Sequence, residues 1–156
     1  MNINGNRRPQ PFYLKTCYIF LLFVSFISLG CGKKEVKPSE DSVLAQNALR
    51  QVELIKAAYE TKDIVSLTNL TDAGLLSSLE KELNFDKADL SFSTPRIIKI
   101  SNSHVTVSVN WQGVWELVGV SRNSRGSGSF VLLKDSMRLV KIDGDNPFAV
   151  PAANMQ

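Results

Sequence analysis

Strict alternation of apolar and polar side chains over residues 104–111 constrains the fold of this chain more than any other feature. A side-chain period of two is typical of an extended strand with one buried face, formed here by Val105, Val107, Val109 and Trp111. An earlier apolar stripe has the period of an amphipathic helix, with spacings of four, four, three and four: Leu44, Ala48, Val52, Ile55 and Tyr59. This change of period predicts an α+β domain in which N-terminal helices pack on an antiparallel sheet.

The rest of the pattern places one domain at residues 43–145. The first helix is expected to end near residue 61, and two more are expected at residues 63–70 and 73–83. Strands are predicted at residues 90–92, 96–100, 104–111, 115–120, 130–134 and 137–142. Gly113 is interpreted as a bulge or a hairpin turn, residues 121–128 (SRNSRGSG) as a loop, and residues 146–156 as a C-terminal tail.

An uncharged and almost wholly apolar segment, residues 16–29, follows Arg7, Arg8 and Lys15. This order is typical of the charged and hydrophobic regions of a secretory signal. The segment leads into Gly30-Cys31, which resembles the lipobox of bacterial lipoproteins. The resemblance implies cleavage before Cys31, so residues 1–30 are interpreted as a signal peptide. The alternative is an uncleaved N-terminal anchor in which Cys31 has no role.

The lipobox resemblance also implies that Cys31 carries a diacylglycerol on its thiol and a fatty acid such as palmitate on its amino group. One acyl chain binds a membrane only weakly, and a second chain makes the attachment stable. The several chains on Cys31 would therefore hold the protein at the membrane. Residues 31–42 are polar, charged and interrupted by Pro38, so they are interpreted as a flexible tether. Gly32 is not the aspartate that retains lipoproteins in the inner membrane of enteric bacteria. The resemblance therefore favours an outer membrane, where the organism has one.

The order of helices and strands resembles the nuclear-transport-factor-2-like superfamily, the cone-shaped fold of SnoaL-like polyketide cyclases and ketosteroid isomerase. Residues 57–67 (AAYETKDIVSL) are similar to that family's helix–break–helix opening, and residues 126–143 are similar to its two final long strands. The resemblance implies helices on a curved sheet that encloses a pocket. A cystatin-like sheet wrapped on a helix is the alternative with the same coarse pattern.

Charge and cysteine content exclude several classes of function. The chain has 18 Lys and Arg against 15 Asp and Glu, but three of the cations and none of the acids precede Cys31. Residues 31–156 are therefore formally neutral, and no nucleic-acid partner is expected. Cys17 lies in the apolar segment and Cys31 is assigned to the lipid, so neither a disulfide nor a cysteine-based metal site is expected in the domain. No cofactor is predicted.

No set of catalytic residues emerges from the sequence. His104 is the only histidine and stands at the start of a strand, where a buried acid–base role is not expected. Asp63 is interpreted as a helix N-cap and Tyr59 as a core residue of the helical stripe. Glu116 is the one strand carboxylate that would become a general base if its side faced inward. The prediction is that Glu116 faces outward and that the protein is not an enzyme.

Trp111 and Trp115 are the candidate ligand or interface residues, because aromatic side chains often dominate binding energy. Core packing of the strands is the competing interpretation. The expected function is that of a non-enzymatic binding or assembly module, held at the membrane by its lipid, for an unknown envelope protein or a small apolar ligand. The family resemblance adds a homodimer through the open sheet face. The alternative function is a small pocket enzyme of the isomerase, dehydratase or cyclase type.

Overall fold

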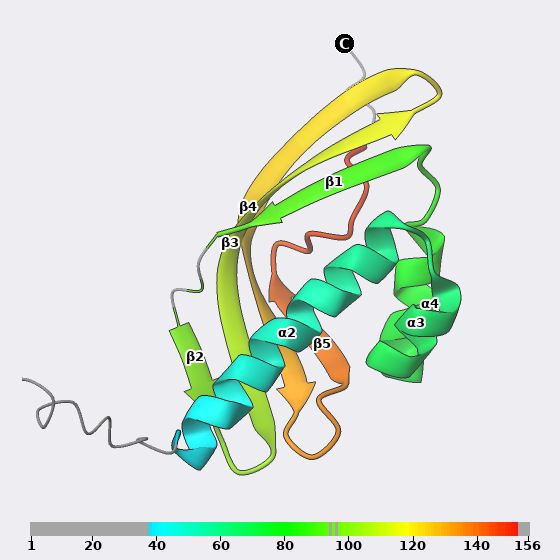
Figure 1. Ribbon diagram of the computed structural model, residues 1–156. Helices are drawn as coiled ribbons and strands as arrows, with labels where there is room; N and C mark the ends of the chain where they lie inside the picture. The colour runs from blue at the N-terminus through cyan, green and yellow to red at the C-terminus, as the bar shows by residue number, and fades with distance from the viewer. Residues whose placement is uncertain (1–37, 94, 96, 153–156) are drawn as a thin grey trace, which may run out of the picture. The chain divides into compact units, whose positions relative to one another are not determined.

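The structure, a computed structural model, describes residues 38–93, 95 and 97–152. The predicted signal peptide and Cys31 lie outside the described residues. Three helices precede five strands along the described chain (Figure 1): α2 (Glu40–Glu60), α3 (Ile64–Leu70), α4 (Ala73–Lys81), β1 (Lys87–Phe92), β2 (Ile97–Ile100), β3 (His104–Leu117), β4 (Val120–Leu133) and β5 (Leu139–Gly144). None of the described helices is both long enough and apolar enough to cross a bilayer.

Helix α2 begins at Glu40 because Ser39 caps it, with Ser39 Oγ accepting a hydrogen bond from the Ser42 amide at 3.2 Å. The predicted end of the tether at residue 42 is therefore wrong, since residues 40–42 form the first helical turn. The buried positions of α2 confirm the predicted apolar stripe from Ala48 through Val52 and Ile55 to Tyr59, and Ala58 is buried beside it. Leu44, the first residue of the predicted stripe, is half-buried.

Two short helices follow α2, and an aspartate caps each of them. Asp63 accepts a hydrogen bond from the Ser66 amide at the start of α3, and Asp72 accepts one from the Gly74 amide at the start of α4. Leu67 and Leu79 are their fully buried residues. The Asp63 cap confirms the structural role that the sequence predicts.

The five strands form one antiparallel sheet in the order β1-β3-β4-β5. Strand β1 pairs with the second half of β3 and β2 with its first half, so β1 and β2 follow one another along the same edge. Helix α2 runs across one face of the curved sheet (Figure 1) and contacts β1, β2 and β3. This arrangement confirms the predicted α+β architecture.

The β3–β4 hairpin differs from the prediction. Residues 121–128 belong to β4 and pair with β3 along its length, so their assignment as a loop is wrong. The hairpin turns at Val118 and Gly119, whose φ angles of 48° and 75° are the positive values that a two-residue hairpin turn of type I′ requires. Gly113 is neither bulge nor turn, since it pairs in register with Leu90 and Ser124.

Gly113 keeps its place on the buried face of β3 because a larger residue would not fit. A Cβ atom there would lie 2.4 Å from Cη2 of Trp115 and 2.5 Å from Cδ2 of Leu90. The alternation of β3 therefore continues without a break from Val105 to Trp115, with Glu116 on the opposite, exposed side. This outward position of Glu116 confirms its predicted orientation.

Candidate functional site

The concave side of the sheet and helix α2 enclose an apolar interior. One face of β1, β3, β4 and β5 contributes buried residues, and the stripe of α2 closes the space opposite them. The buried side chains from the strands are Ala88, Leu90, Val105, Val107, Val109, Trp111, Trp115, Phe130, Leu132 and Leu139.

Phe148 occupies that interior. Beyond β5 the chain continues toward the β3–β4 turn (Figure 1). The fully buried Phe148 ring of this segment lies 4.9 Å from the ring centroid of Tyr59 and 6.0 Å from that of Phe130. Phe92 adds an edge contact at 6.5 Å. The assignment of residues 146–156 as a tail is therefore wrong for the segment around Phe148. Burial of this large apolar ring lowers the free energy of the folded state and so holds the segment in the core.

Polar contacts fix the backbone on both sides of Phe148. Trp111 Nε1 donates a hydrogen bond to the Asp145 carbonyl at 3.0 Å. The Val150 amide donates to Glu82 Oε2 at 2.9 Å, and Arg122 Nη1 donates to the Pro151 carbonyl at 2.8 Å. The donors and acceptors come from α4's end, β3 and β4, so the segment is held from three directions.

Tyr59 and Trp115 form the polar centre of the interior. Trp115 Nε1 donates to Tyr59 Oη at 3.0 Å, and Tyr59 Oη donates to the Glu82 carbonyl at 3.3 Å. Burial raises the pKa of Tyr59, so its hydroxyl stays protonated and acts as a donor. The indole N–H and the Tyr59 hydroxyl therefore both have hydrogen-bond partners inside the core. Tyr59 is the core residue that the sequence predicts.

The structure corrects the surface role assigned to the two tryptophans. Trp115 is fully buried and Trp111 is 6% exposed. Their rings meet edge to face with centroids 6.4 Å apart. The prediction that these tryptophans form an exposed aromatic surface on β3 is therefore wrong. Both residues pack in the core, which was the competing interpretation.

The side chains of the remaining sequence candidates, His104 and Asp63, make hydrogen bonds to residues close to them in sequence. His104 begins β3, with Nδ1 2.8 Å from Ser103 Oγ. The Asp63 carboxylate accepts hydrogen bonds from the hydroxyl and the amide of Ser66, which lower the pKa of Asp63. Over the described ranges, no group of three or more His, Cys, Asp or Glu residues is placed to hold a metal ion.

The opposite, outer face of the sheet carries a depression of about 580 Å³ lined mostly by polar residues, which we call the outer trough. Its lining comes from β1, β3 and β4: Asp89, Ser91, Gln112, Gly113, Val114, Asn123, Ser124 and Arg125. Two smaller hollows of about 310 and 300 Å³ continue it along the same face toward β2 and β5, and Trp111 borders the first of them. The lining offers hydroxyl, amide, carboxylate and guanidinium groups to a ligand.

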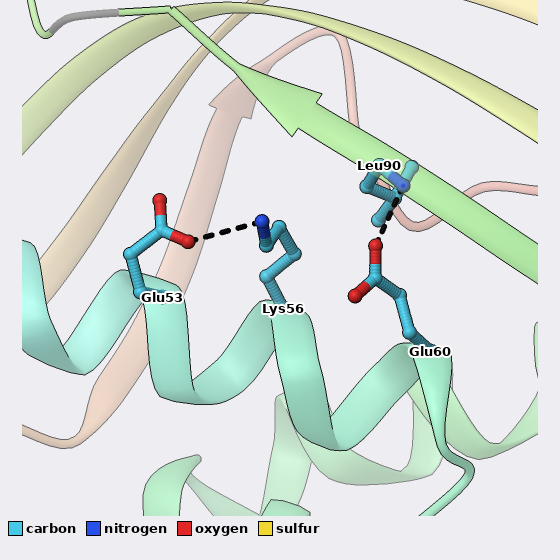
Figure 2. A network of polar contacts seen from close by, with 4 residues as sticks. All are labelled: Glu53, Lys56, Glu60 and Leu90. Atoms are coloured by element: carbon cyan, nitrogen blue, oxygen red, sulfur yellow. Dashed lines mark hydrogen bonds and ion pairs between the residues drawn. The ribbon is translucent and has the colours of Figure 1, made fainter.

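A second pocket, of about 330 Å³, lies where β1 ends and β2 begins, and we call it the edge pocket. It is lined by Leu49, Val52, Glu53, Phe92, Ser93, Pro95, Val107 and Val109. Figure 2 shows the polar contacts of α2 beside it: Lys56 pairs with Glu53 at 3.1 Å, and Glu60 Oε1 accepts from the Leu90 amide at 2.6 Å. The pocket is apolar with one ion pair at its rim.

Sequence reasoning missed both Phe148 and the outer trough. The Asp-Gly-Asp-Asn-Pro run before Phe148 is typical of a chain end, and one aromatic residue after it has no period to signal burial. Asn123 and Arg125 were hidden because residues 121–128 have the composition of a loop. The polar alternation of Ser91, Gln112 and their neighbours was the available signal for a polar outer face.

Helices packed on a strongly curved antiparallel sheet define an α+β cone. A solved structure with this architecture is the "Nuclear transport factor 2 (NTF2-like) superfamily protein from Salmonella enterica subsp. enterica serovar Typhimurium str. LT2". It matches with a TM-score of 0.58 and 13% sequence identity over 74% of this chain and 99% of that one. The domain therefore has the nuclear-transport-factor-2-like fold, as the sequence resemblance predicts. No protein-family model matches the sequence, and no curated protein matches it significantly.

Proposed function

We propose that the protein is a lipoprotein of the bacterial cell envelope whose domain is a binding or assembly module without catalytic activity. The lipobox-like Gly30-Cys31 at the end of an apolar segment supports an anchor at Cys31. The charged residues after Cys31 link it to the capped start of α2 at Glu40. Gly32 in place of aspartate favours the outer membrane, where the organism has one.

The observation that carries the proposal is Phe148 at the centre of the cone. An enzyme of this shape needs space for substrate among inward-facing acid and base groups. Here the ring of Phe148 takes that space against Tyr59 and Phe130, and the Tyr59 hydroxyl is engaged by Trp115 and the Glu82 carbonyl. Recognition is therefore assigned to the exterior of the domain, with the outer trough as the candidate surface.

The edge pocket supports the second candidate function, a small pocket enzyme or a receptor for a small apolar ligand. Its floor of Val52, Val107 and Val109 is apolar, and Glu53 is the carboxylate at its rim. Glu53 is exposed to solvent and forms an ion pair with Lys56. A general acid or base would instead lie in a site shielded from water. The geometry favours the binding module.

Intact-mass analysis of protein extracted from membranes tests the anchor. We expect residues 1–30 to be absent and acyl mass to be present on Cys31, whereas Cys31→Ser should remain full-length and unacylated. Wild-type protein that retains residues 1–30 with an unmodified Cys31 would contradict the proposal.

Benzene tests whether the cone is filled. Replacing Phe148 with alanine leaves an apolar cavity, and such cavities bind benzene. Benzene should therefore raise the midpoint of thermal unfolding of Phe148→Ala and leave that of the wild type unchanged. A comparable rise in the wild type would indicate an open pocket and favour the enzyme.

A further inference from the structure

The outer trough presents a row of polar side chains at matched positions on three adjacent strands. Ser91 of β1, Gln112 of β3 and Arg125 of β4 are register partners, and Asp89, Val114 and Asn123 form the next row. All six are exposed, whereas their neighbours along β1 and β3 are mostly buried and those along β4 are half-buried. The alternation of side chains along a strand therefore places these six on the face away from α2. The rows are held by the sheet itself, so the spacing of these groups is fixed.

The polar side chains of the trough have no partner within the described part of the chain: Asp89, Ser91, Gln112, Asn123 and Arg125 make no side-chain hydrogen bond or ion pair with it. The same face is different in the next two rows toward the start of β3. There Ser108 and Ser129 share a hydrogen bond at 2.7 Å, and Ser127 donates to Asn110 at 2.9 Å. The face therefore divides into a self-bonded part and a part whose donors and acceptors remain available to a ligand.

The chemistry of these groups defines the class of ligand. Asp89 only accepts hydrogen bonds, Arg125 only donates them, and the amides of Gln112 and Asn123 do both. One acid and one base leave the trough without net charge, so it has no electrostatic preference for phosphate, nucleic acid or a cationic peptide. A neutral molecule rich in groups that both donate and accept, such as hydroxyls and acetamides, matches this set.

A protein partner fits the trough less well. An extended peptide binds to the edge of a sheet, where backbone N–H and C=O groups are free, and the trough lies on a face instead. Protein interfaces gain most of their energy from desolvated aromatic and apolar anchors, whereas the apolar side chain among these six residues is Val114 alone.

We propose that the outer trough is a binding site for a neutral glycan chain. This deepens the proposed function and rests on it, since a domain that performs no chemistry in the envelope acts through what it holds. The polar side chains of the two rows, Gln112 and Asn123 among them, form hydrogen bonds with sugar hydroxyl and acetamido groups along the trough.

Isothermal titration calorimetry of the full chain in detergent, with chitotetraose and maltotetraose as probes, tests the proposal. We expect chitotetraose to bind more tightly, because its acetamido groups offer the carboxamides an additional donor and acceptor. Gln112→Ala and Asn123→Ala should each weaken binding about 3- to 10-fold, the effect of one hydrogen bond. Thr106→Ala, on the same face of β3 outside the trough, is the matched control and should bind as the wild type does.

Three outcomes overturn the inference: no binding of either saccharide, binding that Gln112→Ala and Asn123→Ala leave unchanged, or a chain dimeric through this face. Analytical ultracentrifugation of the wild type and of Gln112→Ala identifies the last case. Circular dichroism of each variant separates loss of binding from loss of fold. Intact mass reports on the Cys31 anchor independently, so failure of glycan binding is distinguishable from failure of the proposed envelope location.

Discussion

Trp115 Nε1 donates a hydrogen bond to Tyr59 Oη at 3.0 Å and so joins helix α2 to strand β3. Both residues are fully buried, and Tyr59 also contacts Phe85 and Phe148. The bond is the polar element around which the aromatic interior is built. Its removal leaves a buried indole N–H without an acceptor, which is more costly than the loss of the bond alone.

Tyr59→Phe is accordingly expected to lower the free energy of unfolding by about 1–3 kcal/mol, the cost of one unsatisfied buried donor. Urea denaturation followed by tryptophan fluorescence measures the change. A Trp115→Phe, Tyr59→Phe double variant should show coupling between the two sites, since the second substitution removes the orphaned group. Strict additivity of the two single effects would contradict the role assigned to this hydrogen bond.

Val118 stands at the hairpin turn with a φ of 48°, is 94% exposed and donates its amide to Asp86 Oδ2 at 2.6 Å. A β-branched residue is strained in the left-handed region, where asparagine is tolerated. Val118→Asn should therefore raise the free energy of unfolding by about 1 kcal/mol. Val120→Asn, at an exposed strand position beside the turn, is the control and should not stabilise. A destabilised Val118→Asn variant would refute the positive φ at this turn.

The helix cap at Asp63 should make the stability of the protein depend on pH. Its hydrogen bonds from Ser66 lower the pKa of the carboxyl group in the folded state, so this contribution to stability is present above the unfolded pKa of about 4 and is lost as the pH falls through the folded value. Asp63→Asn keeps a capping oxygen but does not titrate. The stability difference between wild type and variant should be constant near neutral pH and shrink below about pH 4. A difference that grows on acidification would contradict the cap.

Periodicity accounts for how much of the fold the sequence could predict. The stripe from Ala48 to Tyr59 and the alternation from Val105 to Trp111 each place a buried face, and both are confirmed. Residues 121–128 have no such signal, because Ser, Asn, Arg and Gly are typical of loops. They are a strand because β3 offers them a partner along their whole length.

Two glycines of this strand are explained by a contact distant in sequence. A Cβ atom at Gly126 would lie 2.6 Å from Cβ of Asp145, and one at Gly128 would lie 2.7 Å from the Asp145 carbonyl oxygen. They are small because the segment that follows β5 lies against them. The position of Phe148 depends on this contact of the segment after β5 with β4, and the rows of the outer trough depend on the pairing of β3 with β1 and β4. Both are long-range relationships that no local pattern specifies.

Phe148→Ala should lower the free energy of unfolding by about 3–5 kcal/mol, because the surrounding rings of Tyr59 and Phe130 cannot fully close the cavity. Val65→Ala is the matched control: Val65 is 74% exposed on α3, and its truncation should change stability by less than about 0.5 kcal/mol. Equal effects of the two substitutions in chemical denaturation would mean that Phe148 is not in the core.

Amide hydrogen exchange over residues 145–150 of the wild-type protein tests most directly whether the chain fills its own cone. The Asp145 amide donates to the Ser127 carbonyl and the Val150 amide to Glu82 Oε2, both at 2.9 Å, around the buried Phe148. These two amides should therefore be protected to a degree comparable with those of β3. Exchange at the rate of an unstructured peptide at Asp145 and Val150, with β3 still protected, would contradict the account and leave the interior open to a substrate.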